Sequence, residues 1–246
     1  MKKQVLAVTI FGLVTSSSIA QSAFEGGYGQ LASGYENNTY SNLSGTGSNT
    51  SQAIPDSWST SNQSSSGAPL IIGLGYNFSV SPKWLLGIGA DYSAISQQTS
   101  SFSSYSPTGG VNSVPATING FQLQTSNRVN VFVTPGYVID KDKLVYFKAG
   151  YSSASMKETY ANTITKSTGT TALTAWSTSP SATVNGYVLG LGYKQMIANG
   201  FYGFAEANYM SYGKPSFSSV NGLTYTLSNS PSLSTYQALV GIGYKF

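Results

Sequence analysis

Four ionisable side chains stand out in segments that otherwise hold almost no charge: Asp91, Lys148, Glu206 and Arg128. In each segment large apolar residues alternate with small or polar ones, and all four charges fall on the small-residue face. Unpaired charge in a confined space is unfavourable, so we expect these groups to form salt bridges and hydrogen bonds with one another. Such a polar cluster would either fix the register of the fold or gate a slender ion path.

The four charges of the expected cluster can be placed by their height along the predicted strands. Counted from the neighbouring turns, three of the four charges fall at similar heights, and Arg128 lies nearer the far rim. Side-chain amides on the same faces are expected to complete the network: Asn77, Asn130 and Asn208.

The chain contains no His and no Cys, which restricts the catalytic groups and metal ligands that it can supply. This composition excludes a Ser-His-Asp arrangement, a Cys nucleophile and a zinc site of His and Cys ligands. A Ser-Lys pair or paired carboxylates remain possible catalytic groups for an enzyme that modifies membrane lipids. Gly-x-Gly elements such as Gly190-Leu-Gly192 lie in strand-like segments and open no helix, so no dinucleotide site is expected. We predict no catalytic residue, no metal ligand and no cofactor.

The overall composition is unusual for a water-facing protein. Charged residues make up 8% of the chain, against about 25% in soluble domains. Aromatic residues make up 13%, including 18 Tyr. Without Lys2 and Lys3, ten basic residues face eight acidic ones, a net charge of +2 that is too small and scattered to predict a nucleic-acid partner.

The N-terminal residues 1–20 have the features of a signal peptide. Lys2 and Lys3 precede an apolar run from Val5 to Val14, and small residues lead to a cleavage position after Ala20. The alternative is a buried N-terminal helix. No later segment reaches the roughly 18 apolar residues of a transmembrane helix. We therefore predict an exported protein with one domain over residues 21–246.

Eight segments of this domain show the period-two alternation of strands whose two faces meet different surroundings. Each is long enough for a tilted membrane strand, which needs about 9–11 residues. Eight such segments predict an all-β fold. Their even number fits a closed, eight-stranded, antiparallel up-and-down transmembrane barrel. The predicted strands span residues 24–37, 69–80, 84–97, 127–139, 144–159, 183–196, 201–214 and 235–246.

The large residues of each strand share one face, as Leu70, Ile72 and Leu74 do opposite Gly73 and Gly75. A soluble barrel would turn this face inward and leave an outer wall of Gly, Ser and Asn. In a membrane barrel lipid covers the apolar face, and the inward glycines relieve crowding in a narrow cylinder. We predict the apolar face outward; the faces of the first strand stay unassigned.

Aromatic residues on the apolar face gather at two levels, as in the girdles at the two membrane interfaces of outer-membrane barrels. One level lies near the short turns and the other lies further along the strands. The predicted girdle residues are Trp84, Tyr137 and Tyr193 at the first level, and Tyr92, Tyr151 and Tyr187 at the second.

The connections between strands alternate between short and long. Tight turns such as Asp140–Lys143 alternate with long segments rich in Ser, Thr, Asn and Gly. This asymmetry predicts short periplasmic turns, long extracellular loops and both termini in the periplasm. Aromatics in the loops, among them Tyr40, Tyr105, Trp58 and Trp176, are candidates for ligand contact, although the loops could equally be solvated tips. A possible extracellular ligand would bind through loops 38–68, 100–126, 160–182 and 216–234.

The end of the chain carries a further signal. Tyr244 and the final Phe246 resemble the C-terminal signal read by the machinery that inserts outer-membrane barrels. With Pro135-Gly-Tyr137 and the segment 205–213, they make the chain similar to the small outer-membrane barrels grouped with the OmpA-type transmembrane domain, the porin-family or surface-antigen proteins. The resemblance implies a Gram-negative outer membrane and structural, adhesive or antigenic roles.

We therefore expect an integral outer-membrane barrel with a structural and surface-interaction role, and no enzyme. A narrow channel for ions or small solutes, gated by the lumenal salt bridges, is the alternative, and a lipid-modifying enzyme is the third reading. Expected partners are outer-membrane lipids, the barrel-insertion machinery and lipopolysaccharide, whose phosphates basic residues near the outer rim could contact: Lys157, Lys166 and Lys214.

Overall fold

A computed structural model describes residues 22–49, 55–107, 114–160, 163–167, 169–172, 179–221 and 224–246. All regular elements within these ranges are β-strands. None of the described residues forms a helix long and apolar enough to span a bilayer. The predicted signal peptide, residues 1–20, and Trp176 lie outside the described residues.

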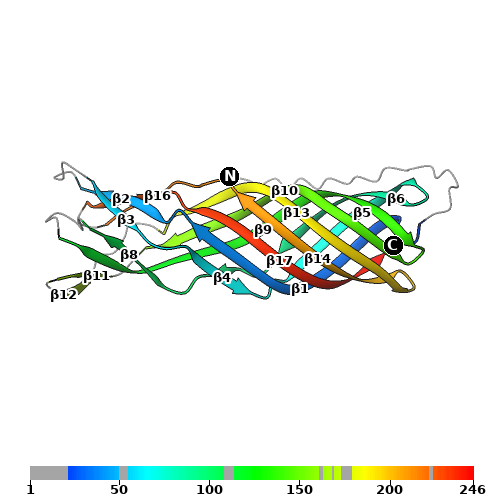
Figure 1. Ribbon diagram of the computed structural model, residues 1–246, viewed down its shortest axis with the longest axis horizontal. Coiled ribbons are helices and arrows are strands. Elements are labelled where there is room, and N and C mark those ends of the chain that lie inside the picture. Colours follow the sequence, from blue (N-terminus) through cyan, green and yellow to red (C-terminus); the bar gives the residue numbers. More distant parts are fainter. Residues whose placement is uncertain are drawn as a thin grey trace, which may run out of the picture.

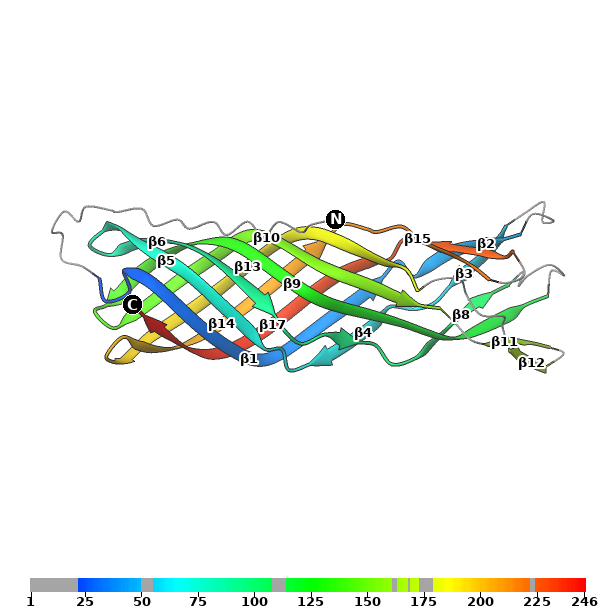
Figure 2. The same cartoon turned by 180° about the vertical axis from the view of Figure 1, so that it is seen from behind.

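Eight long strands pair edge to edge, all antiparallel, and the last pairs with the first, so the sheet closes into a barrel (Figures 1 and 2). The predicted closed eight-stranded up-and-down architecture is thus confirmed. The ring strands are β1 (Gly26–Ser41), β5 (Ile71–Ser81), β6 (Trp84–Ser93), β9 (Ala116–Asp140), β10 (Lys143–Thr159), β13 (Ser181–Ala198), β14 (Phe201–Tyr212) and β17 (Ser232–Lys245).

The largest difference from the prediction is β9, which begins at Ala116, 11 residues before the expected start at Asn127. Two β-bulges explain why the sequence pattern did not reveal the extra length. Gly120 (φ 109°) and Asn127 (φ 49°) have left-handed backbone conformations, and the pairing register shifts next to both. Each bulge moves the inward positions by one residue, so the strict alternation is interrupted and the segment resembles a loop.

The segments predicted as long loops contain eight short strands, and a ninth, β7 (Gln97–Gln98), lies just before the second of these segments; the short strands continue the wall beyond the barrel as an extension (Figure 1). The sequence left open whether these segments are ordered; in the described residues their Ser- and Thr-rich backbones pair with one another and with the outer part of β9. The short strands are β2 (Ser44–Ser48), β3 (Asp56–Ser59), β4 (Gln63–Gly67), β7 (Gln97–Gln98), β8 (Phe102–Ser106), β11 (Thr163–Lys166), β12 (Gly169–Ala172), β15 (Phe217–Val220) and β16 (Thr226–Asn229).

The apolar face of the ring strands points outward, as predicted. Leu74, Leu191 and Ile242 are 66%, 66% and 62% exposed on the outer wall. Strand β1, whose faces the sequence left open, turns Leu31 and Tyr35 outward. Such a belt of large apolar side chains fits a hydrocarbon surrounding and not water.

The inward glycines lie directly under large rings from neighbouring strands. A Cβ at Gly192 would collide with the ring of Tyr146, and one at Gly243 would collide with the ring of Tyr202. These close approaches show that glycine makes room for aromatic side chains in the narrow lumen.

We expect Gly192→Ala to lower the free energy of unfolding by about 1–3 kcal/mol, because the added methyl group overpacks the lumen against Tyr146. Urea unfolding of the protein in detergent micelles measures this change. Gly203→Ala is the matched control, since the nearest atom to a Cβ there is 3.7 Å away. Equal stability of the two variants would contradict the packing role assigned to Gly192.

Candidate functional site: the closed lumen

The centre of the lumen holds a buried lysine between two carboxylates. Lys148 on β10 lies 2.8 Å from Asp91 on β6 and 2.9 Å from Glu206 on β14, measured from its Nζ to the nearest carboxylate oxygens. Its side chain is 1% exposed, and Nζ also lies 4.1 Å from the centre of the Phe132 ring. The structure therefore brings together three of the four predicted charges.

Neutral side chains complete the hydrogen bonds of this lysine site. Asn130 donates to Asp91 over 2.6 Å, and Tyr146 and Asn208 donate to Glu206 over 2.7 and 2.8 Å. The hydrogen bonds stabilise both carboxylates in their charged form.

Asn77 does not take part, although we expected it to. It donates to the carbonyl oxygen of Phe24 over 2.8 Å. Asn77 stands opposite Gly26, near the short-turn end of β5, where the segment before β1 covers it.

The fourth predicted charge, Arg128 on β9, forms a second ion pair further from the short turns. Arg128 Nη1 lies 2.6 Å from Glu36 Oε2, and both side chains are buried. The guanidinium also donates to the Tyr212 hydroxyl over 2.9 Å and to Asn38 Oδ1 over 2.8 Å. The four groups come from β1, β9 and β14, so closure of the ring is required to assemble them.

Sequence reasoning missed Glu36 because the faces of the first strand were left unassigned. The available signal was weak: Glu36, Asn38 and Tyr40 form an inward series, opposite to the outward Leu31 and Tyr35. Glycine and asparagine are frequent around Glu36, and the large residues of β1 do not gather on one face, so the alternation did not show which face points inward.

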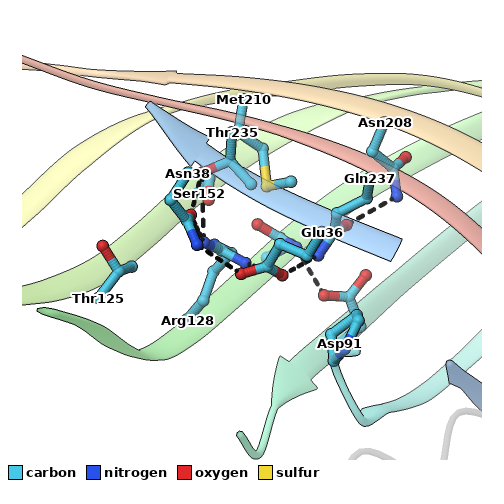
Figure 3. A network of polar contacts seen from close by, with 12 residues as sticks. Glu36, Asn38, Asp91, Thr125, Arg128, Ser152, Asn208, Met210, Thr235 and Gln237 are labelled. Atoms are coloured by element: carbon cyan, nitrogen blue, oxygen red, sulfur yellow. Dashed lines mark hydrogen bonds and ion pairs between the residues drawn. The ribbon is translucent and has the colours of Figure 1, made fainter. Parts of the chain in front are cut away.

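The two ion-pair groups belong to one network. Gln237 donates to Glu36 over 2.7 Å, and Asn208 donates to both Glu206 and Gln237, over 2.8 and 3.2 Å. Figure 3 shows Gln237 between Asn208 and Glu36, with Arg128 reaching across from β9. Continuous hydrogen bonding couples the Lys148 site to the Arg128 site along the barrel.

Lys194 is a further buried cation that the predicted cluster did not include. Its Nζ lies 4.1 Å from the ring centre of Tyr28, 4.8 Å from that of Tyr202 and 5.3 Å from that of Tyr146. These faces attract a cation through their ring quadrupoles. Lys194 is the third basic side chain buried in the barrel lumen, with Lys148 and Arg128, and the buried acidic side chains there are Asp91, Glu36 and Glu206.

Apolar side chains close the polar network at both ends. On the short-turn side, Leu85, Val138 and Leu144 pack with Phe24 in one buried cluster. Towards the extension, a larger cluster includes Tyr40, Leu43, Leu123, Met156, Val184, Met210 and Leu233. The polar network thus lies between two clusters of buried apolar side chains. Among the described residues, no group of His, Cys, Asp or Glu side chains is arranged to hold a metal ion.

The predicted girdle residues lie on the outer wall at the two expected levels. Trp84 and Tyr137 pair across β6 and β9 with ring centres 5.2 Å apart. Tyr193 follows on β13, next to Val145, which is itself the partner of Tyr137. At the other level, Tyr151 stands opposite Tyr187, and Tyr92 donates a hydrogen bond to Asn127.

The last residues of the chain close the seam of the barrel. Tyr244 packs between Phe201 and Phe246, with ring centres 4.8 and 5.4 Å apart. The Phe246 amide donates to the carbonyl oxygen of Gly27 over 2.9 Å, beyond the last paired residues of β17 and β1. The structure therefore places both residues of the predicted insertion signal where the ring is completed.

Two aromatics expected to be available for ligands are buried in the extension. Tyr40 is fully enclosed, and Trp58 is 4% exposed and donates to the Tyr225 hydroxyl over 2.8 Å. Tyr105 remains 50% exposed. The first two were misjudged because the extension has an apolar interior of its own, which the sequence did not predict.

No known family model matches the chain, and no curated protein matches its sequence significantly. Among solved structures, the outer membrane protein OprG from Pseudomonas aeruginosa covers 92% of this chain and 99% of its own length, at 12% identity and a TM-score of 0.50. The chain has the fold of a small outer-membrane β-barrel. This result confirms the predicted resemblance at the level of the fold.

Two other solved structures align with this barrel over most of its length. The outer membrane protease OmpT from Escherichia coli covers 94% of this chain and 100% of its own, at 9% identity and a TM-score of 0.48. Ail, the attachment invasion locus protein of Yersinia pestis, was solved in complex with a heparin analogue; it covers 90% and 99%, at 14% identity and a TM-score of 0.38.

We expect Lys148→Met to destabilise the barrel by about 3–5 kcal/mol, because it leaves Asp91 and Glu206 as uncompensated buried charges. Adding Asp91→Asn and Glu206→Gln to the same variant should recover most of the loss. Urea unfolding in micelles is the measurement, and Lys141→Met in an exposed turn is the control. A triple variant no more stable than Lys148→Met would contradict the charge-pairing explanation.

Proposed function

We propose that this chain is an integral outer-membrane barrel with a sealed lumen, whose role is structural and whose surface interactions take place through the extension. The observation that carries the proposal is the closure of the lumenal polar network by apolar layers on both sides. An eight-stranded barrel is only wide enough for its own side chains to fill it. The ordered extension is then the part of the molecule that is free to meet other molecules.

The proposed orientation places the short turns, the start of β1 and the C-terminus in the periplasm. It is supported by the asymmetry between the two ends, with short turns at one and the extension at the other (Figure 2). Tyr244 and Phe246 would be read by the insertion machinery, and the girdles would contact lipid at both interfaces. Lys157 and Lys214, both exposed towards the extension, would meet lipopolysaccharide phosphates.

A catalytic role is not proposed. The absence of His and Cys from the sequence excludes the commonest nucleophile and base pairs. The lumenal carboxylates Asp91 and Glu206 are engaged by Lys148 and enclosed on both sides.

A narrow channel is the second candidate, and the continuous hydrogen-bonded network from Asp91 to Arg128 favours it. The salt bridges at Lys148 would then act as its gate. Under the proposal of a sealed lumen, the purified protein in planar bilayers shows no steady single-channel conductance. Steady conductance that Lys148→Ala or Glu206→Ala alters would overturn the sealed lumen and establish the gate.

The surface role is tested by adhesion of intact Gram-negative cells that express the protein to a cultured epithelial layer. We expect expression to increase adhesion, and replacement of the β11–β12 hairpin, residues 163–172, by a short Gly-Ser turn to reduce it. In the described part of the chain this hairpin pairs with the wall through β9 alone, so its removal leaves the described ring pairing intact. Lys141→Ala in a short turn is the control. Adhesion that is the same with and without the protein would rule out this surface role.

A further inference from the structure

The extension contains a small cavity whose wall carries a buried carboxylate. Glu158 lies seven residues beyond the girdle residue Tyr151 on β10, roughly 20 Å along the strand at about 3.3 Å per residue. The cavity is partly enclosed and measures about 20 Å³, room for a single group of the size of water. Its wall includes Glu158, Asn229, Trp58, Phe102, Phe121 and Leu227.

Two acceptor oxygens at this cavity have no hydrogen-bond partner among the described residues. Glu158 is 2% exposed, and its Oε1 accepts a hydrogen bond from Asn229 Nδ2 over 2.8 Å. Its Oε2 and Asn229 Oδ1 are buried and unpartnered there. Both are acceptors, so what the site lacks is a donor. Buried acceptors left without a donor are unfavourable, and a bound donor would remove that penalty.

The rest of the wall favours an organic cation over a metal ion. Aromatic side chains from three strands, Trp58, Phe102 and Phe121, line the cavity and supply faces that attract a cation. Hard metal ions need six or more oxygen ligands, whereas the residues that line this cavity carry two unpartnered buried oxygens among the described residues. An ammonium group can donate to two acceptors while its carbon and remaining hydrogens lie against rings.

We propose that this cavity binds a primary ammonium group, the head of a small alkylamine, which donates to Glu158 Oε2 and Asn229 Oδ1 beneath the aromatic wall. The site goes beyond the surface role proposed above, because it stands whether or not the extension binds a cell surface.

The charge of Glu158 makes the site dependent on pH. Burial raises the pKa of the Glu158 carboxyl to about 7, and the hydrogen bond from Asn229 offsets only part of this shift. The other ionisable groups nearby are Tyr160, whose pKa is raised by burial and by Glu158, and Asp56 on β3, which accepts from Tyr225. Below pH 7 the carboxyl is neutral and loses its attraction for a cation, so binding weakens as the pH falls.

The test uses the folded protein in detergent micelles, titrated with methylammonium chloride and followed by calorimetry. At pH 8.5 we expect saturable binding in the millimolar range, as suits so small a ligand. Binding should be at least tenfold weaker at pH 5.5 and be lost in Glu158→Gln, while Asp140→Asn, which removes an exposed carboxylate at the other end, leaves it unchanged.

Two further ligands sharpen the outcome. Tetramethylammonium has no N–H group and exceeds the cavity, so it should not bind. Nα-acetyl-lysine amide distinguishes a lysine side chain from a free amine as the source of the group, and Glu158-dependent binding of this ligand or of methylammonium supports the site.

The pH dependence of binding is measured on the wild-type protein, so it tests the proposal even if the Glu158→Gln variant does not fold. No saturable binding at pH 8.5, equal binding of tetramethylammonium, or affinity that does not change between pH 5.5 and 8.5 would each overturn the proposal.

Discussion

The structure depends on the pairing of β17 with β1. In hydrocarbon an unpaired backbone N–H or C=O group has no water to bind, so a sheet can span a membrane only if it has no free edge. Closure with eight strands then fixes a narrow cylinder. The crowding of glycines under rings, as at Gly192, and the assembly of Glu36 with Arg128 from distant parts of the chain both follow from that closure.

A narrow interior also determines how charge is accommodated. The barrel lumen encloses three basic and three acidic side chains, and each basic side chain has partners of a different kind: two carboxylates for Lys148, one carboxylate and neutral acceptors for Arg128, and aromatic faces for Lys194. Apolar layers separate this compartment from both ends. In the extension, Glu158 and Asn229 lie in the wall of one cavity and each retains an unpartnered oxygen among the described residues.

Much of the fold and part of the site could be predicted from the sequence. Alternation located the ring strands and the inward positions of Lys148 and Glu206, because a residue's face on a regular strand depends only on its position in the period of two. The prediction failed where that period is interrupted. Gly120 and Asn127 shift the phase within β9, and β1 carries large residues on both faces, so the start of β9 and Glu36 were missed. Lys194 lay on an inward face, yet its aromatic surroundings come from three other strands.

The sequence by itself determined the strand pattern, the lipid-facing surface and the near absence of charge, since these follow from the order of residue types along one strand. Only the tertiary structure decided the partners. Register and closure set which strands become neighbours, and neighbours across the lumen need not be close in sequence: Glu36 and Arg128 meet from 92 residues apart. The interior of the extension, with Trp58 and Glu158 enclosed, likewise arises from pairing between loops, which no single segment encodes.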